Sequence, residues 1–196
     1  MHPNPSFRWT DEAEMLAFVA REAFASILVG GPAVVHAPLT VAGRNISFHL
    51  ARRNRGVGAI DGSRVIASVL GRQGYQSANW YNSDDQVPTW LYEVVEIEGV
   101  ARQLEPEELV AQLDALSNAM EQIHSPARIW TRAKMTPGKF EAMLNAIIGF
   151  TIEVEEIRGT SKFNQHKADA DVEAMIAGQT AAGRDDLVAA IREKRP

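Results

Sequence analysis

The segment that most constrains the fold is residues 23–43, AFASILVGGPAVVHAPLTVAG, which contains no Asp, Glu, Lys or Arg. Its length is close to that of a helix that spans a bilayer. However, Gly30-Gly31-Pro32 near its middle interrupts any such helix, and Pro38 follows. Two short β-strands joined by a tight turn account better for this pattern. We therefore expect a β-hairpin here and no membrane span.

Further stretches have the alternating or uniformly apolar pattern of strands. With the hairpin they give six expected strands: Ala25–Val29, Ala33–Val41, Ile46–Leu50, Arg64–Leu70, Trp90–Gln103 and Gly149–Ile157. In the last one Phe150, Ile152 and Val154 alternate with polar residues, which predicts one solvent-exposed face. Residues 71–89 are polar with several aromatics, and we expect a long loop there.

Helical signals flank these strands. Thr10 is expected to cap a helix that starts at Asp11, and Pro106 to open a second helix. Thr136-Pro137 is expected to open a third that ends near Ile147, and the tail from Ala168 reads as two short helices separated near residues 178–183. Six antiparallel strands with helices around them indicate the α+β class and a small β-barrel.

Composition limits the domain organisation and the chemistry. The chain has 196 residues, 45% of them hydrophobic, which is enough for one well-buried domain with a helical appendage. We expect residues 1–167 to form the main domain and residues 168–196 a helical tail packed on it. There are no cysteines, which excludes disulfides, thiolate metal sites and cysteine nucleophiles and fits a cytoplasmic location. The N-terminal residues lack the apolar core of a signal peptide, and no GxSxG, GxGxxG or phosphate-loop motif occurs.

A cluster of arginines follows the third expected strand. The sequence HLARRNRG, residues 49–56, places Arg52, Arg53 and Arg55 within four residues of a chain whose net charge is −5. Guanidinium groups bind phosphate through paired hydrogen bonds, so the cluster is a candidate anion site. A solvated turn at the end of a strand explains the same residues, and the charge pattern alone does not separate the two interpretations.

The aromatic and histidine residues also allow more than one interpretation. Trp80, Tyr81, Trp90 and Tyr92 could stack on a planar cofactor, pack in a dimer interface or belong to the core. The five histidines have no spacing typical of a metal site, and no metal is expected. His36 and His49 could face each other across a hairpin, and a neutral core or interface role is the simpler account of both.

Four stretches together resemble one known family. They are HLARRN (residues 49–54), NWYNSDDQVPTWLYEVVEIEGVAR (residues 79–102), GFTIEVEEIRGTSKFNQ (residues 149–165) and IAGQTAAGRDDLVAAI (residues 176–191). In this order they are similar to the FMN-binding negative transcriptional regulator (PaiB-like) family, which belongs to the flavin-reductase-like split β-barrels. The resemblance implies a six-stranded antiparallel split barrel, a homodimer, and FMN bound at the subunit interface.

The resemblance also implies roles for particular residues. Arg52 and Arg53, with Asn54, would hold the flavin phosphate, while His49 and Leu50 would lie beside the ring or the ribityl chain. The first hairpin would contribute His36 and Pro38 along the ring edge. Trp80, Tyr81 and Trp90 would form an aromatic wall, partly from the second subunit. Lys162 would close the site.

Three functions remain open at this point. The first is a regulator that acts through flavin, a metabolite or a protein partner, and the second is an FMN-dependent oxidoreductase that acts on a small molecule. The third is a barrel without cofactor that acts only through protein contacts. The net charge of −5 and the lack of a helix-turn-helix pattern argue against direct reading of DNA.

Overall fold

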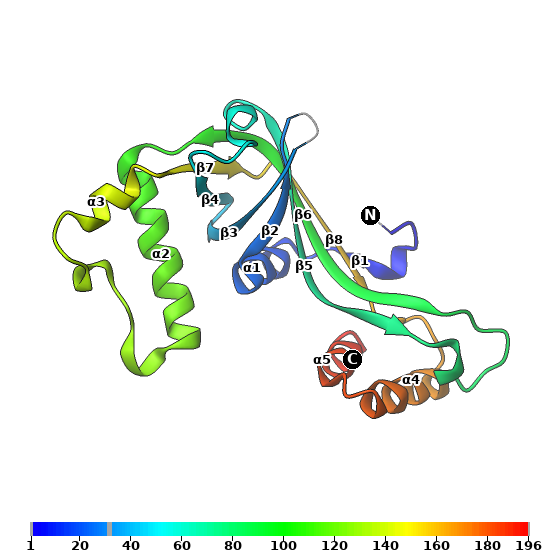
Figure 1. Ribbon diagram of the computed structural model, residues 1–196. Helices are drawn as coiled ribbons and strands as arrows, with labels where there is room; N and C mark the ends of the chain where they lie inside the picture. Colours follow the sequence, from blue (N-terminus) through cyan, green and yellow to red (C-terminus); the bar gives the residue numbers. More distant parts are fainter. Residues whose placement is uncertain (1, 31–32, 196) are drawn as a thin grey trace. The chain divides into compact units, whose positions relative to one another are not determined.

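The computed structural model describes residues 2–30 and 33–195, so Gly31 and Pro32 of the expected hairpin turn lie outside the described residues (Figure 1). The chain divides into two compact units. The larger unit comprises residues 16–69 and 96–157, and the smaller unit comprises residues 1–15, 70–95 and 158–196. The two units are described separately below.

Antiparallel strands form the framework of both units. The described residues contain eight strands: β1 Arg8–Trp9, β2 Phe24–Leu28, β3 Val34–Ala42, β4 Asn45–Ala51, β5 Arg64–Gln76, β6 Thr89–Gln103, β7 Ile147–Glu153 and β8 Glu156–Lys162. The larger unit has the order β5-β2-β3-β4-β7-β6, and the smaller unit has the order β1-β8-β6-β5. Because β5 and β6 are themselves neighbours, strands β2 to β7 form a closed series of pairings. The α+β class is confirmed, and the described residues contain eight strands, of which six, β2 to β7, form this closed series.

The expected last strand is in fact two strands. The expectation of a single strand over Gly149–Ile157 was wrong, because the chain turns after β7 and continues as β8. Long-range bonds fix that turn: the Val154 N–H donates to the carbonyl of Arg44 and the Glu155 N–H to that of Glu98. The expected solvent-exposed face is confirmed for Glu153 and Glu155 but not for Thr151. Thr151 is only 7% exposed, since β7 pairs with β4 and β6 and α2 packs against it.

Two other differences concern the ends of strands. Residues 71–76 were expected to be loop, but they continue β5, which leaves a shorter connection before β6. The two-residue strand β1 was not expected at all, because its pairing with Gly159 and Thr160 of β8 has no local sequence signal. A strand this short exists only through its distant partner.

The helices begin close to where the sequence indicates. They are α1 Glu12–Glu22, α2 Pro106–His124, α3 Lys139–Leu144, α4 Asp169–Ala181 and α5 Asp185–Glu193. Pro106 stands in the first turn of α2, and the Glu108 carboxylate accepts a hydrogen bond from the Glu105 N–H at 2.8 Å, as in a capping box. Gly183, at φ +70°, ends the first tail helix in the left-handed conformation that glycine tolerates.

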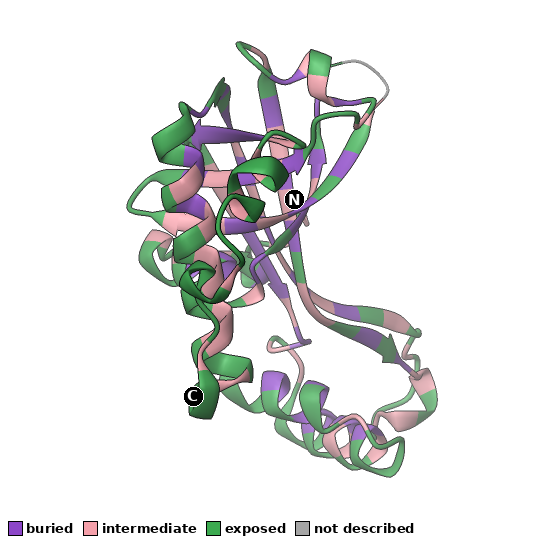
Figure 2. Ribbon diagram, turned by 60° about the vertical axis from the view of Figure 1, so that its left-hand side comes forward, coloured by how far each residue is buried: buried purple, intermediate pink, exposed green. Residues whose placement is uncertain are grey.

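Each unit has its own buried core, shown in purple in Figure 2. In the larger unit the core contains Ile27, Leu39, Ile46, Phe48 and Phe150, all at most 1% exposed. In the smaller unit a cluster joins β6, the end of β8 and the two tail helices through Leu91, Phe163, Val172, Met175, Leu187, Ala190 and Ile191. Within the described residues, no helix is long and apolar enough to cross a membrane.

Candidate functional site

The arginine cluster forms a tight turn held against the β2–β3 hairpin. The side-chain oxygen of Asn54 accepts a hydrogen bond from the Gly56 N–H at 2.9 Å, which closes the turn. A Cβ atom on Gly56 would lie 2.5 Å from Val35 of β3, so only glycine allows this close approach. The turn therefore packs closely against the Val35 side chain of the hairpin.

The three arginines of this turn differ in what they bind. The Arg52 guanidinium donates to the carbonyls of Asn145 and Ile147, at 3.1 and 2.8 Å, just after α3. Arg53 and Arg55 are exposed, and neither has a hydrogen bond or ion pair with any residue that the structure describes. Arg52 thus joins two segments of the fold, whereas Arg53 and Arg55 are available to an anion. Arg55 was not among the residues to which the sequence assigned a role.

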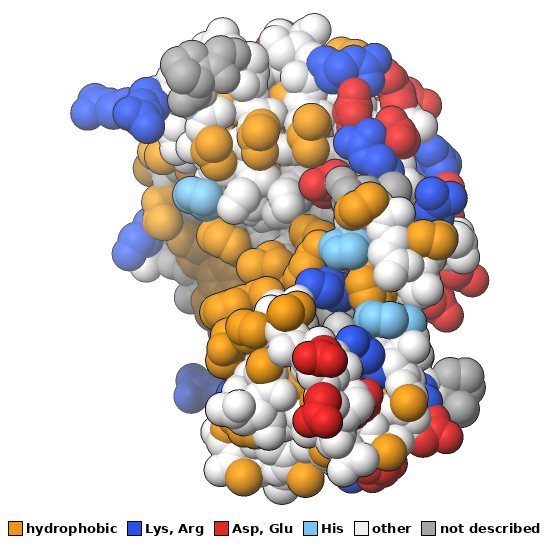
Figure 3. Space-filling view, turned by 90° about the vertical axis from the view of Figure 1, so that its right-hand side faces the viewer, with side chains coloured by type: hydrophobic (Ala, Val, Ile, Leu, Met, Phe, Trp, Pro, Cys, Tyr) orange, Lys and Arg blue, Asp and Glu red, His pale blue; other side chains and the backbone are white. Residues whose placement is uncertain are grey.

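The outer face of the β2–β3 hairpin is uncharged. Cross-strand pairs place Phe24 opposite Pro38, Ser26 opposite His36 and Leu28 opposite Val34. Phe24, Leu28 and Val34 are each about half exposed, and the Ser26 hydroxyl lies 3.1 Å from Nδ1 of His36. Figure 3 shows hydrophobic side chains gathered on one face of the molecule. An exposed apolar surface of this kind is typical of a binding or subunit interface.

The aromatic residues of the smaller unit are less open than expected. Trp90 is 51% exposed, and its indole N–H donates to the Gln73 side chain at 2.6 Å. Trp80, by contrast, lies against Gly178 of α4. The Tyr81 hydroxyl accepts a hydrogen bond from the Asn164 amide at 2.8 Å, and burial raises the pKa of this hydroxyl. Of the three expected wall residues, only Trp90 presents a free aromatic surface.

The contact between Trp80 and Gly178 leads to a prediction about stability. Alanine in place of a helical glycine normally stabilises a protein by about 0.5–1 kcal/mol. Here the added Cβ would lie 2.4 Å from the Trp80 ring, so we expect Gly178→Ala to destabilise the fold by about 1–3 kcal/mol. Urea denaturation measures the change. In a Trp80→Ala background the same substitution should instead be neutral or stabilising, and destabilisation there would contradict this explanation.

Lys162 and its neighbours have structural partners in the smaller unit. The Lys162 ammonium donates to the Thr89 hydroxyl at 2.5 Å, and burial lowers the pKa of this ammonium. The Gln165 amide donates to the carbonyls of Ser6 and Ser161. These residues hold the segment after β8 in place. Lys162 is only partly buried, so it retains an accessible side chain.

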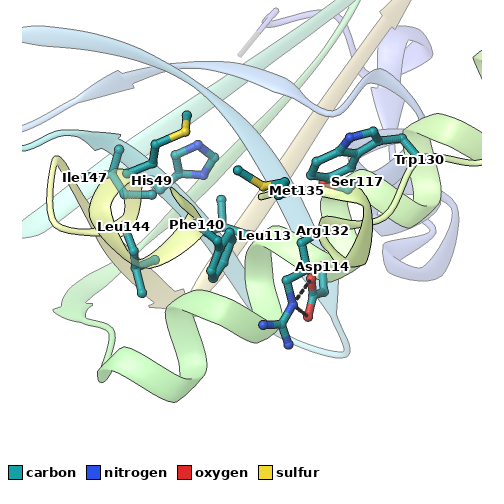
Figure 4. Close-up of a pocket in the computed structure, with 11 residues that line it drawn as sticks. His49, Leu113, Asp114, Ser117, Trp130, Arg132, Met135, Phe140, Leu144 and Ile147 are labelled. Carbon is teal, nitrogen blue, oxygen red and sulfur yellow. Dashed lines mark hydrogen bonds and ion pairs between the residues drawn. The ribbon is translucent and has the colours of Figure 1, made fainter. Parts of the chain in front are cut away.

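His49 and Leu50 lie on opposite faces of β4. Leu50 is 5% exposed in the core, whereas His49 faces α2, where its Nδ1 lies 3.0 Å from the side-chain oxygen of Gln112. His36 and His49 therefore do not face each other, because each has a different partner. His49 lines a cavity of about 290 Å³ with residues of α2, α3 and the segment between them (Figure 4). Sequence reasoning missed this cavity, because its walls come from segments separated by loops.

The residues expected to contact a cofactor thus fall into two sets. His36, Pro38, His49, Leu50, Arg52, Arg53 and Asn54 belong to the larger unit, and Trp80, Tyr81, Trp90 and Lys162 belong to the smaller unit. Within the larger unit, Gly56 of the basic turn packs against Val35, on the buried face of the same hairpin. In the described part of the chain, no group of three or more acidic or histidine residues could hold a metal ion.

The fold is shared with flavin-binding proteins of known structure. The structure of the FAD and haem binding protein from Mycobacterium smegmatis matches with a TM-score of 0.61 at 17% identity, covering 87% of this chain and 80% of that one. The flavocytochrome Anf3 from Azotobacter vinelandii matches with a TM-score of 0.62 at 13% identity, covering 83% and 72%. The fold therefore places the chain in the structural class to which these flavoproteins belong.

Sequence comparison identifies the family. The family model described as "Putative FMN-binding domain" matches residues 1–156. The protease synthase and sporulation protein PAI 2 of Bacillus subtilis (strain 168) is 30% identical over 173 residues, which is 84% of this chain and 82% of that protein. The chain belongs to this FMN-binding family, and FMN is its cofactor.

Proposed function

We propose that FMN binds at the basic turn and the outer face of the β2–β3 hairpin, with its phosphate on Arg53 and Arg55. The observation that carries this proposal is the pair of exposed guanidinium groups that have no partner among the described residues. An anion with several oxygens would satisfy both groups, and the uncharged outer face of the hairpin against which the turn packs suits a flavin ring. His36 and Pro38 are the hairpin residues placed to line that ring.

The other expected contacts have narrower roles in this proposal. Asn54 shapes the turn, Arg52 anchors it to the segment after α3, and Leu50 supports it from the core. Trp90, with its exposed indole, is the aromatic group proposed to cover the flavin from the second subunit. Trp80, Tyr81 and Lys162 support the segment around Trp90. The proposed assembly is a homodimer of six-stranded split barrels in the cytoplasm.

We further propose that the protein regulates through its flavin, a metabolite or a protein partner. The name of the Bacillus subtilis relative, a protease synthase and sporulation protein, supports a regulatory role. The alternative is an FMN-dependent oxidoreductase of a small molecule. In that case the flavin would supply hydride transfer. The Ser26–His36 pair favours this alternative, because it gives the uncharged face one group that can donate or accept a proton.

The absorption spectrum of the purified protein tests FMN binding directly. Flavin bands that copurify, or quenching of FMN fluorescence on titration, are the expected result. Turnover of NADH or NADPH by the loaded protein would favour the oxidoreductase, and a loaded protein without turnover would favour the regulator. A colourless protein that does not quench the fluorescence of added FMN would contradict FMN binding.

The hairpin face predicts the oligomeric state. Leu28 is 47% exposed at the turn end of the uncharged hairpin face, so a second copy of this face would bury it. We expect light scattering to give the mass of two chains for the wild type and of one chain for Leu28→Glu. Ile123→Glu is the matched control, because Ile123 is an exposed residue of α2, outside the hairpin face. A wild-type mass of one chain would contradict the dimer.

Direct recognition of DNA is not expected. With a net charge of −5 the protein lacks the general attraction to phosphate that sequence-specific binding requires. Filter binding with promoter DNA across a salt series should therefore show only weak association, with a dissociation constant of about 1 μM or weaker. Tight binding that weakens steeply with salt would show that the protein reads DNA itself.

A further inference from the structure

We propose that the cavity between β4, α2 and α3 is a second binding site, which takes a small uncharged aromatic molecule that carries a hydrogen-bond donor. The site is built entirely within the larger unit. No residue of β2 or β3 lines it, so it is distinct from the outer face of the β2–β3 hairpin. The cavity would then serve as an effector site, in addition to the flavin site of the protein.

The walls of the cavity are predominantly apolar. Leu113 of α2, Leu144 of α3 and Ile147 of β7 contribute aliphatic surface, and Trp130 and Phe140 contribute aromatic rings. Two methionines also line it, and thioethers pack favourably against the edges of aromatic rings. Figure 4 shows Phe140 and Met135 drawn between His49 and Trp130. Such a lining selects a flat apolar ligand over a polar one.

The size of the cavity limits the ligand to one or two rings. An apolar cavity of about 150 Å³ is large enough to hold benzene. The volume here is about 290 Å³, which is roughly twice that figure. A phenol or an indole therefore fits.

His49 supplies the polar contact that selects among aromatic molecules. With the Gln112 side-chain oxygen toward His49, as the structure has it, the hydrogen bond between them places the proton on Nδ1 of His49. In the neutral imidazole the other nitrogen, Nε2, is then an acceptor, and no described residue donates to it. Gln112 is 5% exposed, so it holds the imidazole from a buried position. A ligand hydroxyl or ring N–H would complete this hydrogen bond.

The charges at the cavity are already paired. Arg132 forms an ion pair with Asp114 at 3.0 Å, and its guanidinium lies 5.1 Å from the centre of the Phe140 ring. Figure 4 shows this pair among the lining side chains. The pair leaves no unbalanced charge for a carboxylate or an ammonium, so an uncharged ligand is favoured over an ion.

Calorimetric titration of the full-length protein with phenol, toluene and benzoate tests the proposal. We expect phenol to bind about five- to tenfold more tightly than toluene, which lacks the donor. Benzoate should bind more weakly than phenol. His49→Phe keeps a ring at this position but removes the acceptor, so the preference for phenol over toluene should disappear. Equal binding of phenol and toluene by the wild type would refute the role of His49.

Two tryptophan substitutions on one helix separate cavity binding from general effects. Ser117 lines the cavity, so Ser117→Trp should abolish binding of all three probes. Ala119 is exposed on the same helix and does not line the cavity, so Ala119→Trp should bind as the wild type does. Circular dichroism must show that both variants are folded. Equal effects of the two substitutions would overturn the assignment of the probes to this cavity.

Saturation with FMN distinguishes the two sites. Phenol affinity should change by less than an order of magnitude when FMN is bound, because the proposed sites are separate. Complete loss of phenol binding in the FMN-loaded protein would mean that the flavin itself occupies this cavity, and would overturn the inference. Absence of binding by all probes, with and without FMN, would do the same.

Discussion

The double variant Arg53→Ala/Arg55→Ala is expected to bind FMN at least about 100-fold more weakly than the wild type. Each guanidinium would make a charge-assisted hydrogen bond to phosphate, worth about 1.5–3 kcal/mol, and about 1.4 kcal/mol corresponds to a tenfold change. Neither side chain has a partner among the described residues, so the fold should not change. Titration of FMN by fluorescence quenching measures the affinity, and thermal unfolding without FMN checks the stability.

Arg52→Ala is the matched control within the same turn. Its guanidinium holds the carbonyls of Asn145 and Ile147, so its loss should lower the unfolding temperature and weaken FMN binding less than the double variant does. If FMN binding were instead lost in Arg52→Ala and retained in the double variant, the phosphate would be bound by Arg52.

Replacement of Arg72 by alanine is expected to cause the largest loss of stability, about 3–5 kcal/mol. Glu93 is 1% exposed, and its carboxylate accepts hydrogen bonds from the Arg72 guanidinium at 2.7 and 3.3 Å. The same guanidinium reaches Glu193 at 2.6 Å. These contacts, that with Glu193 foremost, raise the pKa of Arg72 well above its ordinary value. Alanine would leave the buried carboxylate without its counter-charge, with the backbone N–H of residue 72 as its one remaining donor in the described part of the chain, and chemical denaturation measures the cost.

A double variant shows whether the cost comes from the unpaired charge. In Arg72→Met/Glu93→Leu both charges are replaced by apolar groups of similar size, so most of the stability should return. Glu193→Gln removes only the exposed partner and should cost less than about 1 kcal/mol. If the double variant were as unstable as Arg72→Ala, the loss would come from packing rather than from the buried charge.

Local signals predicted most of the framework. The uncharged segment predicted the β2–β3 hairpin, and Pro106 predicted the start of α2. The two tail helices are separated at Gly183, within the range predicted from the sequence. The errors concern long-range contacts. The turn between β7 and β8 depends on bonds from residues 154 and 155 to residues 44 and 98, and β1 depends on β8. No window of sequence contains both partners of these bonds.

The candidate site divides in the same way. The cluster of arginines in the sequence predicted the basic turn, and the family resemblance predicted FMN as the cofactor. Which arginine is free could not be predicted, because Arg52 is held by carbonyls more than ninety residues further along the chain. Trp80 and Tyr81 are expected cofactor contacts, and the sequence did not predict that Trp80 packs against Gly178 of α4 or that the Tyr81 hydroxyl bonds to Asn164 after β8. The cavity at His49 required the structure, since α2, α3 and β4 supply its walls.

The pairing of β1 with β8 has a consequence for how the chain folds during synthesis. Arg8 and Trp9 leave the ribosome early, but their partners Thr160 and Gly159 are made about 150 residues later. At about 5–20 residues per second this delay lasts roughly 8–30 seconds. During that time the first residues have no strand to join, and helices α4 and α5, which complete the smaller unit, do not yet exist. The larger unit, which ends at Ile157, can form first, and the smaller unit is completed only when the last residues emerge.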